Sequence, residues 1–216
     1  MIKKIAATTL AVTVLAGCQT TNPYTGEGEF NKTSKYGGIG ALAGAVVGGI
    51  ADGKKGALKG AAVGAAAGAG YGYYVDRQED KLRAQLRGTG VQVQRQGNHL
   101  RLIMPGNITF NTNSYDIQAG FYRVLNSVST VLKEFDKNGV EVVGHTDSTG
   151  GYQYNQQLSQ KRAQSVASYL INQGVTPNRV SYYGAGPDNP IADNSSAGGR
   201  QQNRRVEINL QPPAQY

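Results

Sequence analysis

The stretch GHTDSTGGYQYNQQLSQKRA, residues 144–163, joins the end of an apolar segment to the start of an amphipathic one through a glycine pair. The four residues before it, VEVV at 140–143, suit a buried strand. After it, apolar side chains recur at helical spacing: Leu158, Ala163, Val166, Ala167 and Leu170. We therefore expect a strand over 140–143 and a helix over 155–173, which Gly174 ends.

The flanking segments extend this strand–helix unit into a domain. Segments 91–95 and 100–104 alternate around Gly97 and Asn98, which predicts a hairpin. Residues 117–135 carry an amphipathic helical pattern, whereas 180–184 and 205–210 have the composition of strands. The sequence thus predicts an α+β sandwich of βαβαββ type, with helices packed on one sheet, over residues 91–212.

The same stretch contains His145, Asp147 and Ser148, which raises the question of catalysis. A serine nucleophile needs a histidine base beside it, but no GxSxG turn surrounds Ser148 or Ser159. No second His or Cys stands at ligand spacing from His145, so neither a metal nor another cofactor is expected. We expect no enzyme here. His145 should be a packed residue that ends the strand by hydrogen bonding, on the same face as Asp147.

The chain begins like an exported lipoprotein. Lys3 and Lys4 precede an apolar run over 5–16 that is too short to span a bilayer, which is typical of a signal peptide. The following LAGC, residues 15–18, resembles the lipobox of bacterial lipoproteins, where the cysteine is acylated and becomes the first mature residue. Cys18 is the only cysteine, so lipid attachment also explains a thiol that no disulfide within the chain could use. By the same resemblance, Gln19 fits sorting to the outer membrane.

Between the signal peptide, residues 1–17, and the domain lie three further segments. Residues 18–35 are polar and form a predicted tether, and residues 76–90 are charged and form a predicted helical linker. In residues 36–75 glycines recur every four positions, a pattern that lets helices approach closely in a membrane. We expect a glycine-zipper helical hairpin there, which could form a homo-oligomer; a flexible Gly/Ala linker is the alternative.

The charge balance is basic. Lys and Arg total 22 against 14 Asp and Glu, and removal of Lys3 and Lys4 with the signal peptide leaves 20 against 14, a net charge of +6. No run of basic residues interleaved with aromatics is present, and an exported lipoprotein rarely meets nucleic acid. The balance therefore indicates contact with anionic lipid and cell-wall polymer and excludes nucleic acid as the expected partner.

Three motifs in this order, residues 144–175, the RVSYYGAGPDNPIADN segment and the GRQQNRRVEI segment, resemble the peptidoglycan-binding domain of the OmpA C-terminal family. Together with the lipobox and the zipper, the layout is similar to the YiaD-like outer-membrane lipoproteins. The resemblance implies a lipid-anchored outer-membrane protein whose periplasmic domain binds the diaminopimelate of peptidoglycan stem peptides. The alternative is an oligomeric or pore-forming envelope factor built on the zipper, in which wall binding serves only for positioning.

The resemblance also implies a binding site. Asp147 and Arg162 match the family's acid and base that contact the ammonium and carboxylate of diaminopimelate. The expected lining residues are Phe110, Asn111, Thr146, Asn155 and Leu158. The family often has Asp at the position of Asn111, which leaves that residue's role open. An ordinary salt bridge between Asp147 and Arg162 is the other interpretation. Arg204 and Arg205 match the family too, and we expect them to pair with carboxylates inside the domain.

Overall fold

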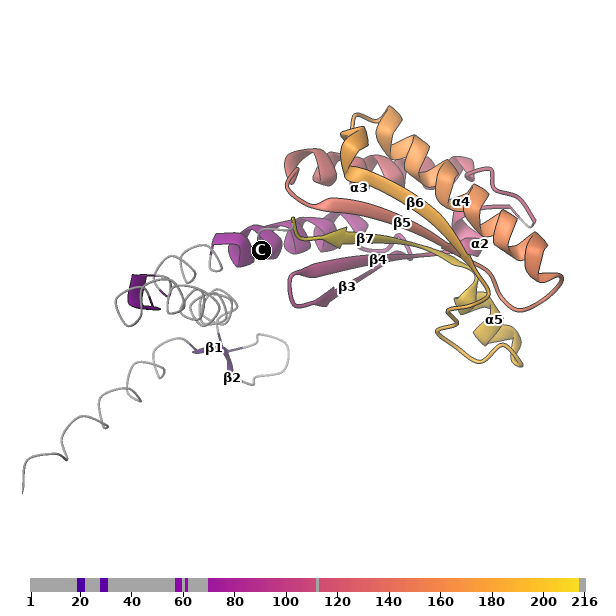
Figure 1. Ribbon diagram of the computed structural model, residues 1–216, viewed down its shortest axis with the longest axis horizontal. Helices are drawn as coiled ribbons and strands as arrows, with labels where there is room; N and C mark the ends of the chain where they lie inside the picture. Colours follow the sequence, from indigo (N-terminus) through magenta and orange to yellow (C-terminus); the bar gives the residue numbers. More distant parts are fainter. Residues whose placement is uncertain are drawn as a thin grey trace, which may run out of the picture. The chain divides into compact units, whose positions relative to one another are not determined.

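The computed structural model describes residues 19–21, 28–30, 57–59, 61, 70–111 and 113–213 (Figure 1). The chain divides into two compact units, residues 1–73 and 74–216. Cys18, most of the predicted zipper and Thr112 lie outside the described residues. The helical hairpin and the lipidation site therefore stay predictions.

The described part of the first unit is small. Strands β1 (Gln19–Thr21) and β2 (Gly28–Phe30) pair antiparallel within the segment predicted as a tether. Residues 57–59 and 61 are helical, as the hairpin prediction expects of its second arm. None of the helices in the described ranges has both the length and the apolar character needed to cross a membrane.

The second unit contains a five-stranded mixed sheet. Its strands are β3 (Gln92–Gln96), β4 (His99–Pro105), β5 (Gly139–His145), β6 (Val180–Gly186) and β7 (Arg205–Gln211). Their spatial order is β3-β4-β7-β5-β6, in which only β5 and β6 are parallel. The last strand of the chain thus lies in the middle of the sheet, between β4 and β5.

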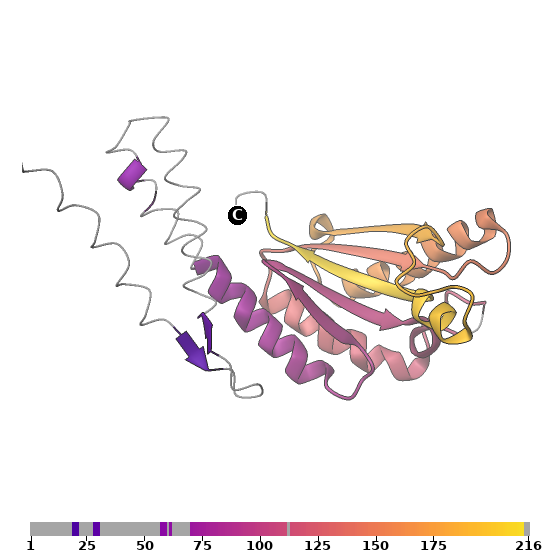
Figure 2. The ribbon, with the colours of Figure 1, turned by 90° about the horizontal axis from the view of Figure 1, so that it is seen from below.

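Two long helices, α3 (Tyr122–Glu134) and α4 (Tyr152–Asn172), run along one face of this sheet (Figures 1 and 2). Alternate residues of the central strands face them and supply the core, because successive strand side chains point to opposite faces. The core consists mainly of Leu100, Leu102, Met104, Val140, Val142, Val206, Ile208 and Leu210 from the sheet and of Leu125, Val128, Leu132, Val166 and Leu170 from the helices. The predicted α+β sandwich is confirmed.

Helix α4 packs against β5 and β6 at unusually short range. A β-carbon at Gly144 would lie 2.1 Å from the carbonyl oxygen of Ser159, and one at Gly184 would lie 2.4 Å from the backbone nitrogen of Gln160. Only glycine permits this approach of strand and helix backbones. The contact places the first half of α4 directly over the carboxyl end of β5, where the cleft described below is found.

The structure corrects the start of the helix predicted over residues 117–135, and it contains helices that were not predicted. Residues 117–121 do not begin α3 as expected, because Ile117 forms a bridge with Phe110 and a 3₁₀ turn, Ala119–Phe121, precedes the helix. Two helices were not predicted: the single turn α2 (Gly106–Thr109) and the longer α5 (Ala197–Asn203). The sequence of α5, AGGRQQN, has no apolar period. Its start is stabilised instead by the Ser196 side chain, which accepts a hydrogen bond from the Gly199 backbone N–H at 3.0 Å.

The predicted helical linker is helical and also packs into the folded unit. Residues 70–86 form one helix, and Val75, Leu82 and Leu86 are buried. Arg95 of β3 pairs with Glu79 at 2.8 Å, and the ring of Tyr74 packs edge-on against Phe135 with centroids 5.2 Å apart. Residues 74–86 are therefore part of the compact unit, although their charged composition predicted a linker outside a domain beginning at residue 91.

Candidate functional site: a charged cleft at the carboxyl end of strand β5

One cleft of about 450 Å³ opens where β5 ends and α4 begins. All seven residues expected from the resemblance line it: Phe110, Asn111, Thr146, Asp147, Asn155, Leu158 and Arg162. The cleft is also lined by seven residues that were not predicted from the sequence: Gly106, Asn107, Asn113, Gln118, Thr149, Tyr154 and Arg204. The structure therefore brings the predicted set together, and their role in binding stays a prediction.

The loop after β5 places Asp147. Strand pairing ends at His145, and the next residue, Thr146, donates its backbone N–H to Gly186 at 2.9 Å. The carboxylate of Asp147 accepts the backbone N–H of Thr149 at 2.8 Å, and the Asn155 side chain donates to the Thr149 carbonyl at 2.9 Å. Asn155 thus lines the cleft and also holds the loop that carries the acid.

Asp147 pairs with Arg204. The Arg204 Nη1 donates to the Asp147 Oδ2 at 2.5 Å. Burial opposes ionisation of Asp147, but hydrogen bonds from Arg204 and Thr149 outweigh it and lower the pKa of this carboxyl below its ordinary value. Arg204 was expected to pair with a carboxylate inside the domain, and it does. Its place on the cleft wall was missed, because the two residues are 57 positions apart.

Arg162 lines the same cleft. Its Nε donates to the Ser114 carbonyl at 2.9 Å, and its guanidinium lies over the Phe110 ring, 5.2 Å from the centroid. Burial lowers the pKa of Arg162, and nearby Tyr154 and Asp147 oppose that effect. Within the described residues Nε is the only Arg162 nitrogen that donates to a protein atom, so its two Nη groups have no described protein acceptor. Phe110 holds the guanidinium by a cation–π contact.

Asp147 and Arg162 do not form the direct salt bridge that was considered as the other interpretation. In the part of the chain that the structure describes, the ion pair of Asp147 is with Arg204. Two guanidinium groups and one carboxylate therefore line one cleft. Such a set suits a ligand that carries a carboxylate and an ammonium a few ångström apart, since both signs of charge are presented to it.

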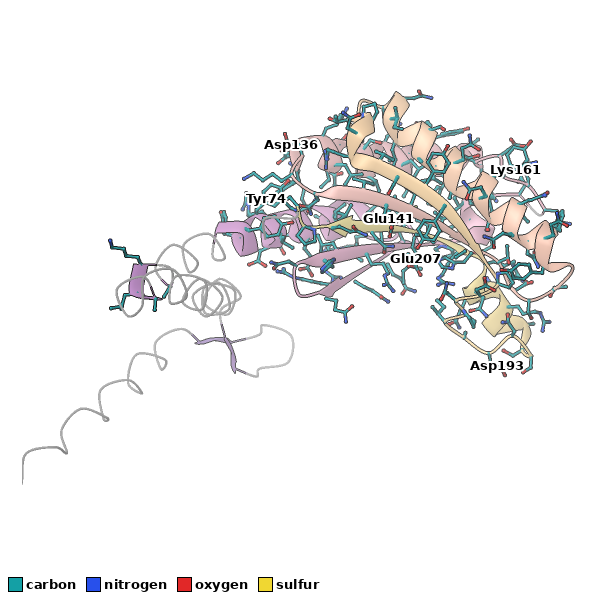
Figure 3. All side chains as sticks on the ribbon, viewed as in Figure 1. Tyr74, Asp136, Glu141, Lys161, Asp193 and Glu207 are labelled. Atoms are coloured by element: carbon teal, nitrogen blue, oxygen red, sulfur yellow. The ribbon has the colours of Figure 1, made fainter. Side chains whose placement is uncertain are left out.

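The prediction for His145 is confirmed in its position at the end of the strand and wrong in its hydrogen bonding. It ends β5 and is buried, but neither ring nitrogen has a hydrogen-bond partner among the described residues, so the expected hydrogen bond is wrong. Its ring lies near Glu207 of β7 (labelled in Figure 3), with Nε2 to Oε1 at 3.8 Å. The two side chains do not share a face as expected. Asp147 lines the cleft, because the alternation of strand side chains ends at His145.

Burial and the neighbouring Arg205 lower the pKa of His145 to about 4, although Glu207 opposes them. Arg205 also bonds Glu207, Nε to Oε1 at 2.7 Å, as expected of a residue paired inside the domain. Across the described ranges, no group of three or more His, Cys, Asp or Glu side chains is placed to hold a metal ion.

Comparison with known proteins assigns the chain to a class. A profile of the OmpA family matches residues 109–204, which include every residue of the predicted cleft, and a profile of YMGG-like glycine zippers matches residues 1–76. The chain belongs to the OmpA family.

The particular relative that matches nearly end to end is "Probable lipoprotein YiaD" of Escherichia coli K12, 52% identical over 96% of both chains. "Peptidoglycan-binding protein ArfA" of Mycobacterium tuberculosis is 38% identical over 50% of this chain and 33% of its own length. Among solved structures, the cell wall anchor of the T6SS from Pseudomonas aeruginosa covers 63% of this chain and 98% of its own, at 30% identity and a TM-score of 0.58.

Proposed function

We propose that this protein binds peptidoglycan in the cleft through the diaminopimelate of the stem peptide, and that acylation of Cys18 holds it in the outer membrane. The protein then anchors the outer membrane to the cell wall, without making or breaking covalent bonds. The observation that carries the proposal is the presence of buried Asp147 and Arg162 on one cleft without a bond between them.

The chemistry of the ligand matches these two groups. The side-chain end of diaminopimelate carries an ammonium and a carboxylate on one carbon. The oxygens of Asp147 accept hydrogen bonds from Thr149 and Arg204. A carboxylate has four acceptor sites, so it keeps capacity for a further donor, which an ammonium would supply. The Nη groups of Arg162 would grip the ligand carboxylate with two parallel hydrogen bonds. Each charged hydrogen bond contributes about 1.5–3 kcal/mol, which with help from neighbours suffices for roughly micromolar binding.

Two relatives support the proposal. One is named as a peptidoglycan-binding protein, and the other, a solved structure, is a cell wall anchor. The relative that matches nearly end to end is named as a probable lipoprotein, which supports a lipid-anchored chain. The absence of catalysis is part of the proposal. It is supported by the separate surroundings of the candidate groups, since Asp147 contacts Arg204 and Thr149 while the His145 ring lies beside Glu207.

Substitution of the two charged residues tests the proposal. Asp147→Ala and Arg162→Ala should each remove most binding of the purified protein to peptidoglycan sacculi, because each change deletes one ligand contact and leaves the matching charge of the ligand without its partner. The double variant should lose little beyond the weaker-binding single variant, since both groups hold one ligand. Arg162→Lys keeps the charge but not the fork and should bind weakly. Pull-down with sacculi measures the effect.

Matched controls are Asp80→Ala and Arg87→Ala, which remove exposed charges of the same kinds outside the cleft. Thermal unfolding of every variant separates lost binding from lost folding. If both cleft variants sediment with sacculi as fully as the wild-type protein while remaining folded, the proposal is wrong.

A further inference from the structure

One face of α4 runs from the mouth of the cleft to its floor. Tyr154, Leu158 and Arg162 are four residues apart, so they lie on the same side of the helix, and all three line the cleft. Tyr154 is 53% exposed, and Leu158 and Arg162 are 9% and 6% exposed. The charge-binding end is therefore deep, and the ring of Tyr154 lies at the opening.

The part of the mouth that the start of α4 forms is uncharged. No Asp, Glu, Lys or Arg occurs from residue 148 to residue 160, although the chain as a whole is rich in them. The exposed side chains of the first turns of α4 are tyrosines and glutamines. Such a surface suits a neutral polar ligand, because a flat ring packs against C–H groups while side-chain amides exchange hydrogen bonds with hydroxyl and amide groups. An amino sugar presents both kinds of group.

The spacing of Tyr154 and Arg162 along α4 fits the position of a sugar in the proposed ligand. Tyr154 and Arg162 are eight positions apart on the helix, which corresponds to about 12 Å along its axis. In peptidoglycan, two residues of the stem peptide lie between diaminopimelate and the amino sugar. Two extended residues span at most about 7 Å, and the diaminopimelate side chain adds several more. A sugar linked to a stem peptide held at Arg162 therefore reaches the mouth of the cleft.

We propose that Tyr154 is a sugar-binding residue, and that its ring stacks on the amino sugar that carries the bound stem peptide. This inference rests on the proposed function, because it takes the diaminopimelate end to occupy the floor of the cleft. Tyrosine suits such a contact, because it has two side-chain torsions, so ordering it costs little conformational entropy for the area it covers. The cleft then binds both the stem peptide and the sugar to which that peptide is attached.

Isothermal titration calorimetry with two ligands tests the inference: the free stem tripeptide ending in diaminopimelate, and the same tripeptide attached to its disaccharide. We expect the wild-type protein to bind the disaccharide form about five-fold more tightly, a typical effect for one aromatic contact. Tyr154→Ala should bind both ligands with equal affinity, at the wild-type value for the tripeptide. Tyr154→Phe keeps the ring and should retain most of the preference.

Tyr152→Ala is the matched control. Tyr152 is 59% exposed on the same helix but two positions away, its hydroxyl donates to Asp188 at 2.8 Å, and it does not line the cleft. Its substitution should leave the preference intact. Equal wild-type affinity for the two ligands, an unchanged preference in Tyr154→Ala, or an equal loss in Tyr152→Ala would each overturn the sugar contact alone. If the wild-type protein binds neither ligand, the proposed function fails together with it.

Discussion

At the scale of single residues, the two histidines differ in their surroundings. His99 is exposed, whereas His145 is buried near Arg205 and Glu207. A buried imidazole beside a guanidinium resists protonation, since the charged form loses water and gains an unfavourable neighbour. The arrangement links folding stability to pH, and the direction of the effect follows from the lowered pKa.

His145 should make the protein less stable in acid. Its pKa falls from 6.5 to about 4 on folding, so the unfolded chain binds a proton between these values that the folded chain does not. Stability is lost as pH falls from about 6.5 to 4, by roughly 3 kcal/mol. His145→Phe should reduce the pH dependence of the unfolding free energy in this window, measured by urea denaturation. His99→Phe should keep it, and an equal slope in wild-type protein and His145→Phe would refute the assignment.

At the scale of elements, the helix over residues 70–86 has an importance that its sequence does not reveal. VDRQEDKLRAQLR, residues 75–87, is charged and contains few apolar residues, which is typical of a solvated linker. Its apolar positions are nevertheless buried, and its charges pair with partners on β3 and α3: Asp76 and Glu79 with Arg95, and Lys81 with Glu134. The helix therefore contributes both packing and ion pairs to the second unit.

Truncation of one buried residue on this helix should measure that contribution. Leu82 is fully buried, so Leu82→Ala should lower the unfolding free energy by about 2–5 kcal/mol. Arg77→Ala, an exposed position on the same helix, should change it by less than about 0.5 kcal/mol. Chemical denaturation of the purified protein gives both values. A Leu82→Ala variant as stable as the wild-type protein would mean that the helix is only a linker.

At the scale of the whole molecule, we propose two attachments, one in each unit of the chain. Cys18 would carry lipid near the mature N-terminus, and the cleft around Asp147 and Arg162 would hold the cell wall. Two or more acyl chains give stable membrane anchoring, whereas one is marginal, so the proposed lipoprotein modification is sufficient by itself at the membrane end.

The two attachments should be separable. Cys18→Ser should produce a longer precursor without acyl chains, which is seen as a mass change and as loss from the outer-membrane fraction after density-gradient centrifugation. Asp147→Ala should retain the acyl chains and the membrane fraction and lose only sacculus binding. An acylated Cys18→Ser protein in the outer membrane would disprove the lipidation site.

Much of the fold and the site could be predicted from local patterns. Alternation and helical periodicity located the five strands of the second unit and its helices α3 and α4. An element that buries one face has apolar residues at the spacing of that face, which the sequence shows directly. The seven expected cleft residues came from the family resemblance, and the fold brings all of them to one cleft. Local pattern failed where glycine and polar residues form structure: α5 has two glycines, and Asn203 holds its loop by accepting the backbone N–H of Ile191 and of Ala192.

The spacing of residues does not determine the order of the strands in the sheet. Strand β7 pairs with β4 on one side and β5 on the other, and this register places His145 opposite Arg205. The neighbouring Arg204 is thereby brought to Asp147, 57 positions earlier. The helix over residues 70–86 likewise pairs with β3 through Glu79 and Arg95 and with α3 through Lys81 and Glu134. Such contacts depend on which elements pack together, since a residue's local sequence specifies which face it presents but not what lies opposite that face.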